Sequence, residues 1–304
     1  FIIGLLIGLN KKIWPIYFHK DTFTIGLLFG ESPFDLRERE KNVNPIIRPE
    51  DITDFHCRFV ADPFLYKHNA KWFIFYEAMD MKNHRAKICY SYSTDTQNWF
   101  YGGIAIEEKF HLSYPYIFNH ENKLFMLPET NRKYEIRLYE CRNFPDKWEQ
   151  CNVLLKGRYT DPSITLHDGV WYLFLTETGS NILRLFYSDK LFKDWFEHPK
   201  SPIVIDDRAR ARSAGKIITY GTRLYRFSQD CTKIYGENVR AHEIIKLNKT
   251  EYSEKEYSEK PILHPTGKGW NAHRTHHLHA IEEAPGNWIA VVDGLEKKQG
   301  IFIK

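Results

Sequence analysis

Residues 60–77 read VADPFLYKHNAKWFIFYE and consist of two strand-like hydrophobic runs around a polar turn at residues 68–71. Related stretches recur at residues 114–129 (YPYIFNHENKLFMLPE) and 161–177 (DPSITLHDGVWYLFLTE). In each copy a proline follows the first residue of the motif, an Asn, Asp or Gly type of turn separates the two runs, and a glutamate ends the second run. Two hydrophobic runs joined by a short polar turn are typical of a β-hairpin.

Two fainter copies follow at residues 213–229 and 277–293, so that successive copies start about 50 to 60 residues apart, a spacing typical of an array of sheet modules. In the clearer copies a third strand-like run comes next, as at residues 87–92 (KICYSY), and then a turn and a tryptophan such as Trp99. Three or four short strands per repeat, joined by turns, predict the blades of a propeller. The sequence therefore predicts an all-β protein, namely a five-bladed β-propeller.

A further strand-like run, residues 22–30 (TFTIGLLFG), precedes the first full repeat. We expect this N-terminal strand to pair with the last blade, near residues 288–292 and 301–303, because a ring closed in this way leaves no unpaired sheet edge. Three polar stretches are expected to be connections rather than strands: residues 31–49, 196–207 and 247–269.

The predicted domain division is an N-terminal extension at residues 1–21 and a single propeller domain at residues 22–304. Residues 1–9 (FIIGLLIGL) are apolar but too few to span a bilayer. They also lack the basic region and the small-residue cleavage site of a signal peptide. The chain begins with phenylalanine rather than methionine, which is compatible with its being part of a longer protein.

The composition narrows the class of protein. The 304 residues are 42% hydrophobic, which is enough for the core of one propeller. The net charge is only +4 and the basic residues are interspersed with acidic ones, so we expect no nucleic-acid partner. An odd number of cysteines without CxxC spacing argues against a disulfide framework and favours a reducing, cytoplasmic compartment. The five cysteines are Cys57, Cys89, Cys141, Cys151 and Cys231.

The repeat positions predict where polar side chains meet. In a propeller the first strand of each blade lines the central channel, and the residues that start this strand lie at one mouth of the channel. The motif therefore predicts a ring around one pocket, formed by Asp62, Tyr114, Asp161, Ser213 and His277. The ends of the second strands form another polar set, at a distance from the mouth that the sequence leaves open: Glu77, Glu129, Glu177, Gln229 and Asp293.

Two aspartates from different blades suggest a chemistry. Paired carboxyl groups are what glycoside chemistry needs, because one protonates the leaving oxygen while the other acts as base or nucleophile. Nearby like charges raise the pKa of one group and so divide the two roles. An Asp-Pro step is also suited to a tight turn where a strand begins, so a purely structural role for Asp62 and Asp161 stays open.

Seven segments carry a resemblance to known propellers: GESPFDL (30–36), FVADPFL (59–65), HLSYPYIF (111–118), LPET (127–130), TDPSI (160–164), RARSAGKI (210–217) and SQDCTKIYG (228–236). The repeated motif resembles the five-bladed propellers of the arabinanase, xylosidase and fructosidase type. More specifically, the chain resembles the propeller that forms the N-terminal part of plant glucosamine inositolphosphorylceramide transferase and of related bacterial proteins.

The resemblance to arabinanase-type enzymes implies catalytic roles. Asp62 would be the base, and Asp161 would orient and tune the acid. The acid of those enzymes is a glutamate from blade four, but here residues 210–215 contain no carboxylate. Glu129 is then our candidate acid from another blade, with Glu177 as an alternative. Arg212, which occupies the acid's region, suits an anionic substrate such as a sugar phosphate.

The remaining candidates would bind substrate. Tyr114 could stack on a sugar ring, and Glu177, Gln229 and Asp230 could bind sugar hydroxyls, although each residue could equally serve the core or satisfy buried backbone groups. The resemblance also implies a central ion or water near His277. No zinc-type ligand spacing occurs, so we predict no metal set, and the sequence requires no cofactor.

Three functions stay open. The first is a glycoside-active enzyme, either a transferase or a hydrolase. The second is a non-catalytic module that binds a glycan or a glycolipid headgroup within a glycan-biosynthesis system, and the third is a structural propeller. The expected partner is a carbohydrate or sugar-phosphate ligand, and contact with a membrane is expected only through a glycolipid substrate or a segment outside this chain.

Overall fold

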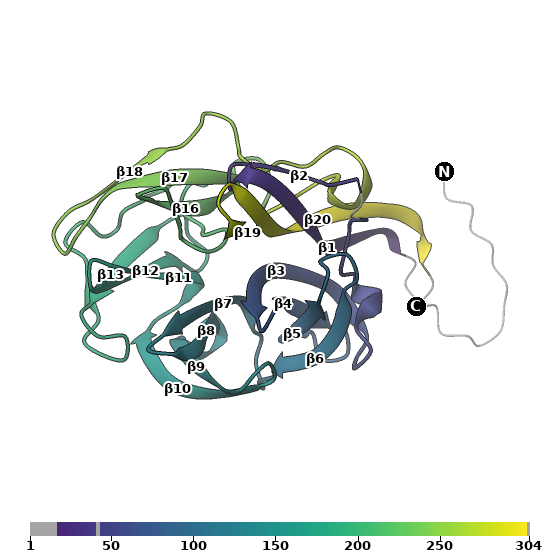
Figure 1. Ribbon diagram of the computed structural model, residues 1–304, viewed down its shortest axis with the longest axis horizontal. Coiled ribbons are helices and arrows are strands. Elements are labelled where there is room, and N and C mark those ends of the chain that lie inside the picture. The colour runs from purple at the N-terminus through teal and green to yellow at the C-terminus, as the bar shows by residue number, and fades with distance from the viewer. Residues whose placement is uncertain (1–16, 41–42, 303–304) are drawn as a thin grey trace.

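The computed structural model describes residues 17–40 and 43–302, which form five antiparallel sheets of four strands each, set in a ring. The strands β3, β7, β11 and β19 lie toward the middle of the ring in Figure 1. This arrangement confirms the predicted all-β fold and its five blades.

The blades follow the order of the chain, except that the fifth combines both chain ends. Blade one contains β3 (Cys57–His68), β4 (Lys71–Asp80), β5 (Arg85–Ser93) and β6 (Phe100–Ile106). Blade two contains β7 (Ser113–His120), β8 (Lys123–Glu129), β9 (Glu135–Asn143) and β10 (Lys147–Lys156). Blade three contains β11 (Tyr159–His167), β12 (Val170–Glu177), β13 (Leu183–Ser188) and β14 (Phe196–Glu197). Blade four contains β15 (Ile218–Tyr220), β16 (Arg223–Asp230), β17 (Asn238–Leu247) and β18 (Tyr252–Glu256). Blade five contains β19 (Leu278–Ala284), β20 (Asn287–Phe302), β1 (Tyr17–Ser32) and β2 (Asp35–Arg37). Three short 3₁₀ turns complete the described structure: Pro49–Asp51, Asn131–Lys133 and Gly269–Asn271.

The second strands of blades one to three are hydrophobic along most of their length rather than alternating. In β4, seven consecutive residues from Trp72 to Ala78 are buried. A strand inside a blade has another blade against each of its faces, so both sets of side chains are removed from water. Aromatic residues fill these interfaces, as where Phe75 meets Trp148 of the next blade with ring centroids 5.8 Å apart.

A β-bulge occurs at the start of the motif in the first three blades. The pairing register shifts between Ala61 and Phe64 in β3, and Asp62 inside the shift has a positive φ of 52°. Tyr114 and Asp161 occupy the same place in β7 and β11, with φ of 48° and 49°. The proline that follows has no N–H to donate to the neighbouring strand, and at a bulge this donor is not needed. The bulge also changes the direction of the preceding side chain. A left-handed non-glycine residue costs roughly 1–3 kcal/mol, so the surroundings must hold each one in place.

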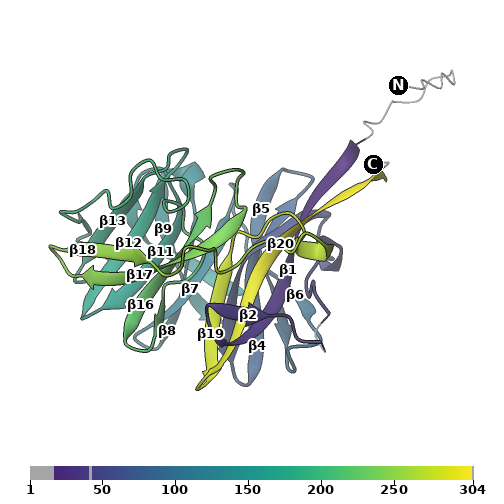
Figure 2. The same ribbon diagram turned by 90° about the horizontal axis from the view of Figure 1, so that it is seen from above.

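The N-terminal strand closes the ring. β1 pairs antiparallel with β20, from Tyr17 opposite Phe302 to Gly30 opposite Trp288, and β2 pairs with its other edge. The predicted closure is therefore confirmed, although residue 303 of the predicted partner lies outside the described residues. The two strands continue past the blade as a projecting ribbon (Figure 2). Because β1 begins at Tyr17, the strand starts inside the predicted extension, and the domain boundary at residue 21 stays a prediction.

The polar stretches contain short outer strands, contrary to our expectation that they are connections alone. β2, β14 and β18 lie within them and complete blades five, three and four. Glu254 in β18 is buried because Arg226 donates Nε and Nη2 to its two carboxylate oxygens, both at 2.5 Å. These outer strands pair with only one neighbouring strand, and their polar composition gave no sequence signal for a strand.

Within residues 17–40 and 43–302, no helix has the length and apolar character needed to cross a membrane. All five cysteines are free thiols.

Candidate active site

Four buried acidic residues come from blades one, two, three and five: Asp62, Glu129, Asp161 and Asp293. Asp62 is 5% exposed, and burial raises its pKa to about 7 while the nearby His276 limits the rise. The charges of Asp161 and Asp293 act in the same direction as burial. The side chain of Asp62 lies 3.5 Å from Nε2 of His276, and its backbone N–H donates to Oδ2 of Asp293 at 3.3 Å.

The ends of the second strands meet the same site. Burial raises the pKa of Glu77 and of Glu129 well above their usual range, and the charge on Asp161 contributes to both shifts. Oε2 of Glu129 also accepts the backbone N–H of Asp161 at 3.2 Å. Glu77, which the sequence analysis placed in the polar set but not among the site residues, lies 3.3 Å from Nε2 of His111.

Asp161 is held in an ion pair. Nε of Arg212 donates to Oδ2 of Asp161 at 2.5 Å, and Nε2 of Gln229 donates to the same oxygen at 3.1 Å. Gln229 also donates to the carbonyl oxygen of Ser213 at 3.0 Å, which fixes the amide between two blades. Cζ of Arg212 lies 4.8 Å from the centre of the Tyr235 ring, so the guanidinium is stacked as well as paired.

Blade five contributes two residues that the sequence analysis did not select as site residues, His276 and Asp293. Nδ1 of His276 lies 2.9 Å from Oδ2 of Asp293, and Nε2 of the same ring lies 3.5 Å from Oδ1 of Asp62. Burial opposes a charge on His276, but Asp293 more than offsets this effect and raises the pKa of the imidazole. The side chains of Asp293, His276 and Asp62 thus lie in a row, with each ring nitrogen of His276 at ion-pair distance from a carboxylate oxygen.

His277, which we chose from the sequence, is completely buried. Its Nδ1 lies 3.7 Å from Oδ1 of Asp62, and its ring packs edge-on against Phe64 and Tyr114 at centroid distances of 4.7 and 5.3 Å. Burial lowers the pKa of His277 to about 3, so this imidazole is neutral at physiological pH.

Tyr114 spans the channel. Its hydroxyl donates to the carbonyl oxygen of Gly215 at 2.8 Å, accepts the N–H of Gly215 at 2.8 Å and lies 2.9 Å from Oγ of Ser163. The side chain is fully buried, so it ties blade two to blades three and four. Gly215 is required there, because a Cβ would lie 1.8 Å from the carbonyl oxygen of Leu278.

Two other candidates have partners of their own. Asp230 accepts Nε of Arg240 at 2.8 Å and the N–H of Thr232 at 3.0 Å, and nothing in the described structure links it to Asp62. Glu177 is bonded to Nε of Arg184. The roles of both residues in substrate binding stay predictions.

The residues whose arrangement suits a cation are Asp62, His276 and Asp293 rather than His277. Asp62, His276 and Asp293 are the one set of His, Cys, Asp and Glu residues in the described structure whose ligand atoms all lie within 4.8 Å of one another. Both ring nitrogens of His276 already face a carboxylate oxygen, so a metal ion would have to replace a proton on this ring.

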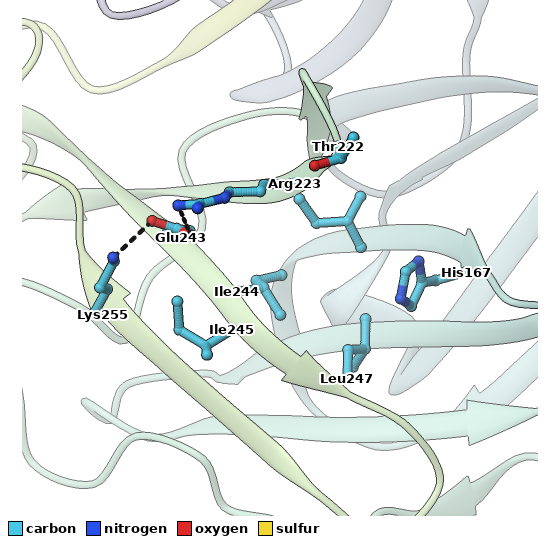
Figure 3. Close-up of a pocket in the computed structure, with 9 residues that line it drawn as sticks. His167, Thr222, Arg223, Glu243, Ile244, Ile245, Leu247 and Lys255 are labelled. Carbon is cyan, nitrogen blue, oxygen red and sulfur yellow. Dashed lines mark hydrogen bonds and ion pairs between the residues drawn. The ribbon is translucent and has the colours of Figure 1, made fainter.

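A cavity of about 210 Å³ adjoins the site between blades three and four. Of the predicted site residues it takes in Glu177 and Arg212, together with Arg208 and Tyr235. A larger cavity of about 480 Å³ lies elsewhere on blade four, beside β17 and the His167 turn (Figure 3).

The larger cavity is a poor candidate for the site. Glu243 lies between Arg223 and Lys255 there, at 2.6 and 3.1 Å, so its charged groups neutralise one another (Figure 3). The group of buried carboxyl and imidazole side chains lies instead at the mouth of the channel.

Unpaired buried atoms gather at this mouth. Buried Oδ1 of Asp62 and Oε1 of Gln229 have no hydrogen-bond partner among the described residues. Nearly all buried polar groups in proteins find a partner, so such a concentration is a feature of sites that bind a ligand or water.

The fold is a five-bladed propeller, and solved structures of carbohydrate-active proteins share it. It is similar to a glycosyl hydrolase from Bacteroides ovatus, with a TM-score of 0.61, 13% identity, and coverage of 84% of this chain and 92% of that chain. It is equally similar to a structure from the GH130 family of mannoside phosphorylases, described as containing glycoside hydrolases that target β-1,2-mannosidic linkages in Candida mannan. That match has a TM-score of 0.62, 13% identity, and coverage of 84% of this chain and 92% of that chain. At this level of identity the likeness concerns the fold.

The sequence relation is narrower. The chain matches the family described as glucosamine inositolphosphorylceramide transferase 1, N-terminal, over residues 19–295, and it belongs to that family. It is 35% identical over 298 residues to glucosamine inositolphosphorylceramide transferase 1 of Oryza sativa subsp. japonica, a match that covers 90% of this chain. The chain spans about 40% of the length of that relative.

Proposed function

We propose that this propeller is carbohydrate-active and that its mouth acts on the glycosidic bond of a glycoside or glycoconjugate. The observation that supports this most strongly is the pair of buried carboxyl groups Asp62 and Glu129. Asp62 titrates near neutral pH, with a pKa of about 7, and burial favours the protonated form of Glu129. An acid and a base in one dry site are the requirements of glycosyl hydrolysis or transfer.

Each residue then has a role. Asp62 acts as base or nucleophile, and His276, held by Asp293, accepts or returns its proton. Glu129 is the general acid, and its contact with the backbone of Asp161 holds it beside the second aspartate. Asp161 positions Arg212 rather than reacting, because its carboxylate is committed to that guanidinium.

The substrate class follows from the chemistry of the mouth and from the relatives. Carboxyl, amide, imidazole and phenol groups are suited to the hydroxyl groups of a sugar. The rice relative is named glucosamine inositolphosphorylceramide transferase 1, and the similar folds include a glycosyl hydrolase. A glycan or a glycolipid headgroup is therefore the proposed ligand, and the activity of the full-length relatives is attributed to this domain only as part of this proposal.

A second candidate is recognition of such a ligand without catalysis. Two observations favour it. Residues 210–215, the region of blade four where the resemblance to arabinanase-type enzymes implies the acid, contain no carboxylate, and Asp62 and Glu129 are only 5% and 6% exposed.

A screen of the purified protein separates the two candidates. Binding is measured on a broad glycan array that includes inositol-containing glycans, and product formation is followed on the ligands that bind. Binding with turnover supports the first candidate, and binding without turnover supports the second. If no glycan binds, both candidates fail and a structural propeller remains.

A further inference from the structure

Three arginines alternate along the segment that links β14 to β15: Arg208, Arg210 and Arg212. The carbonyl oxygens of Arg208 and Arg212 accept the backbone N–H groups of Cys231 and Gln229, at 2.9 and 2.8 Å. These bonds fasten the segment along the edge of blade four. The backbone turns at Arg208 to Arg210, and these bonds hold it in place.

The middle arginine is structural. Nη2 of Arg210 donates to Oε1 of Glu254 at 2.9 Å, the same buried acid that holds Arg226. Arg208 and Arg212, in contrast, both line the cavity of about 210 Å³.

The cavity has an excess of positive charge. Arg212 uses Nε for Asp161, and no acceptor within the described ranges lies at hydrogen-bond distance from its two Nη groups. Arg208 is exposed, and no acidic side chain among the described residues is within ion-pair distance of it. The acid that lines the cavity, Glu177, is already bonded to Arg184. Asp161 is paired with Arg212 and Glu177 with Arg184, so Arg208 has no acidic partner among the described residues.

Neutral donors surround the two guanidinium groups. Tyr235 stacks on Arg212 and is 41% exposed, and Ser180 and Asn181, on the β12–β13 turn, also line the cavity. The volume is below the roughly 300–1,000 Å³ of sites for drug-sized ligands, so the cavity suits one compact group. Guanidinium groups bind phosphate oxygens in pairs, with charge-assisted hydrogen bonds.

We propose that this cavity binds the phosphate group of a sugar phosphate or of a phosphorylated glycolipid headgroup, with Arg208 and the Nη groups of Arg212 as its ligands. The inference rests on the proposed function, since the ion pair between Arg212 and Asp161 joins the cavity to the carboxyl groups. A phosphate held here places the attached sugar beside Asp161 and so fixes its orientation at the mouth.

Calorimetry with three probes tests the phosphate site: myo-inositol 1-phosphate, myo-inositol and inorganic phosphate. The phosphate ester is expected to bind at least tenfold more tightly than myo-inositol, and its affinity should fall as salt is raised. Arg208→Ala should weaken the ester by about tenfold to a hundredfold, the loss expected for one charge-assisted hydrogen bond, and Arg208→Lys should restore part of it. Arg223→Ala is the matched control, because it removes the same charge from an exposed arginine on the other cavity.

The three probes distinguish a phosphate ester from free phosphate as the ligand. They also distinguish failure of the phosphate site from failure of the proposed carbohydrate site. An ester that binds more tightly than inorganic phosphate identifies a headgroup or sugar phosphate, whereas equal affinities identify free phosphate as the ligand of the same site. If Arg208→Ala weakens ester and myo-inositol equally, or if Arg223→Ala has the same effect, the phosphate site is wrong while the carbohydrate site stands. If neither the three probes nor any glycan of the array binds, both proposals fail.

Discussion

The carboxylate of Asp293 accepts the backbone N–H of Asp62 at 3.3 Å, across the seam where blade five meets blade one. Glu129 of blade two makes the equivalent contact with the N–H of Asp161 in blade three, at 3.2 Å. In both cases an acid on the second strand of one blade holds the first motif residue of the next blade. The contact supports a left-handed backbone, with φ of 52° at Asp62 and 49° at Asp161.

Replacing Asp293 should therefore destabilise the whole ring. Its carboxylate also accepts the backbone N–H groups of His276 and His277, at 2.9 and 3.1 Å. Asp293→Ala leaves these buried donors and the His276 ring without their partner, so we expect a loss of at least about 3 kcal/mol in the free energy of unfolding. Denaturant unfolding measures this loss. Asp189→Ala, which removes an exposed acid, should cost less than about 1 kcal/mol, and a similar loss in both variants would contradict the account.

Three buried carboxyl groups should make the stability of the protein depend on pH. Burial raises the pKa of Asp62, Glu77 and Glu129 in the folded state. Their contribution to stability is then complete below the unfolded pKa of roughly 4 and is lost as pH rises through the folded values. Although burial opposes it, His276 lowers the pKa of Asp293, whose contribution is lost only as pH falls through its folded value.

We therefore expect these three carboxyl groups to stabilise the protein less at pH 8 than at pH 5, with a decline between the two values. Buried histidines such as His277 and His242, whose pKa values burial lowers to about 3, act in the opposite direction as pH falls below roughly 6.5. In Asp62→Asn, whose amide resembles the protonated acid, the decline between roughly pH 5 and pH 8 should be smaller by at least about 1.4 kcal/mol. Denaturant curves at several pH values measure both. Parallel pH profiles for the two proteins would show that Asp62 has an ordinary pKa.

Tyr114→Phe distinguishes a structural role of this ring from contact with substrate. The variant leaves Gly215 and Ser163 without the buried hydroxyl, so the free energy of unfolding should fall by about 1–3 kcal/mol. Affinity for a glycan found on the array should be unchanged, because the side chain is fully buried. Weaker glycan binding at unchanged stability would instead support the role in substrate binding suggested by the sequence.

Removing residues 1–29 tests the closure of the ring. The deletion takes away most of β1, which lies between β20 and β2, and so exposes an edge of the fifth blade. We expect loss of the cooperative thermal transition, measured by calorimetry. A deletion of residues 1–16 keeps every described pairing of β1 and is the control. The same melting temperature for both deletions would rule out this role of the strand.

Much of the fold could be predicted because each repeat contains local sequence signals for its strands and turns. The proline after Asp62, Tyr114 and Asp161 marks the same bulge in three blades, and the polar turns mark the hairpins. The outer strands escaped prediction because a strand with one neighbour, such as β18, can be polar along most of its length.

The site was harder to predict for a related reason. The alignment of the repeats predicts that Asp62 and Asp161 lie at one mouth of the channel. It does not predict which residues next to the start of a motif, such as His276 next to His277, face these aspartates. His276 precedes β19 and faces Asp62 only because Asp293 holds its backbone and its ring. The ion pair between Arg212 and Asp161 likewise depends on the path of a non-repeating segment, which local sequence patterns do not specify.

Turnover by Asp62→Asn is the most direct test of the central claim, that a carbohydrate site uses this carboxyl group as base or nucleophile. The assay follows product formation and affinity on the best ligand of the array, for the wild type, for Asp62→Asn and for Asp80→Asn, a buried acid of the same blade that pairs with Lys87. We predict that Asp62→Asn lowers turnover by roughly 100-fold or more while binding survives, and that Asp80→Asn retains turnover in proportion to its folded fraction. Undiminished turnover by a folded Asp62→Asn protein would contradict the claim.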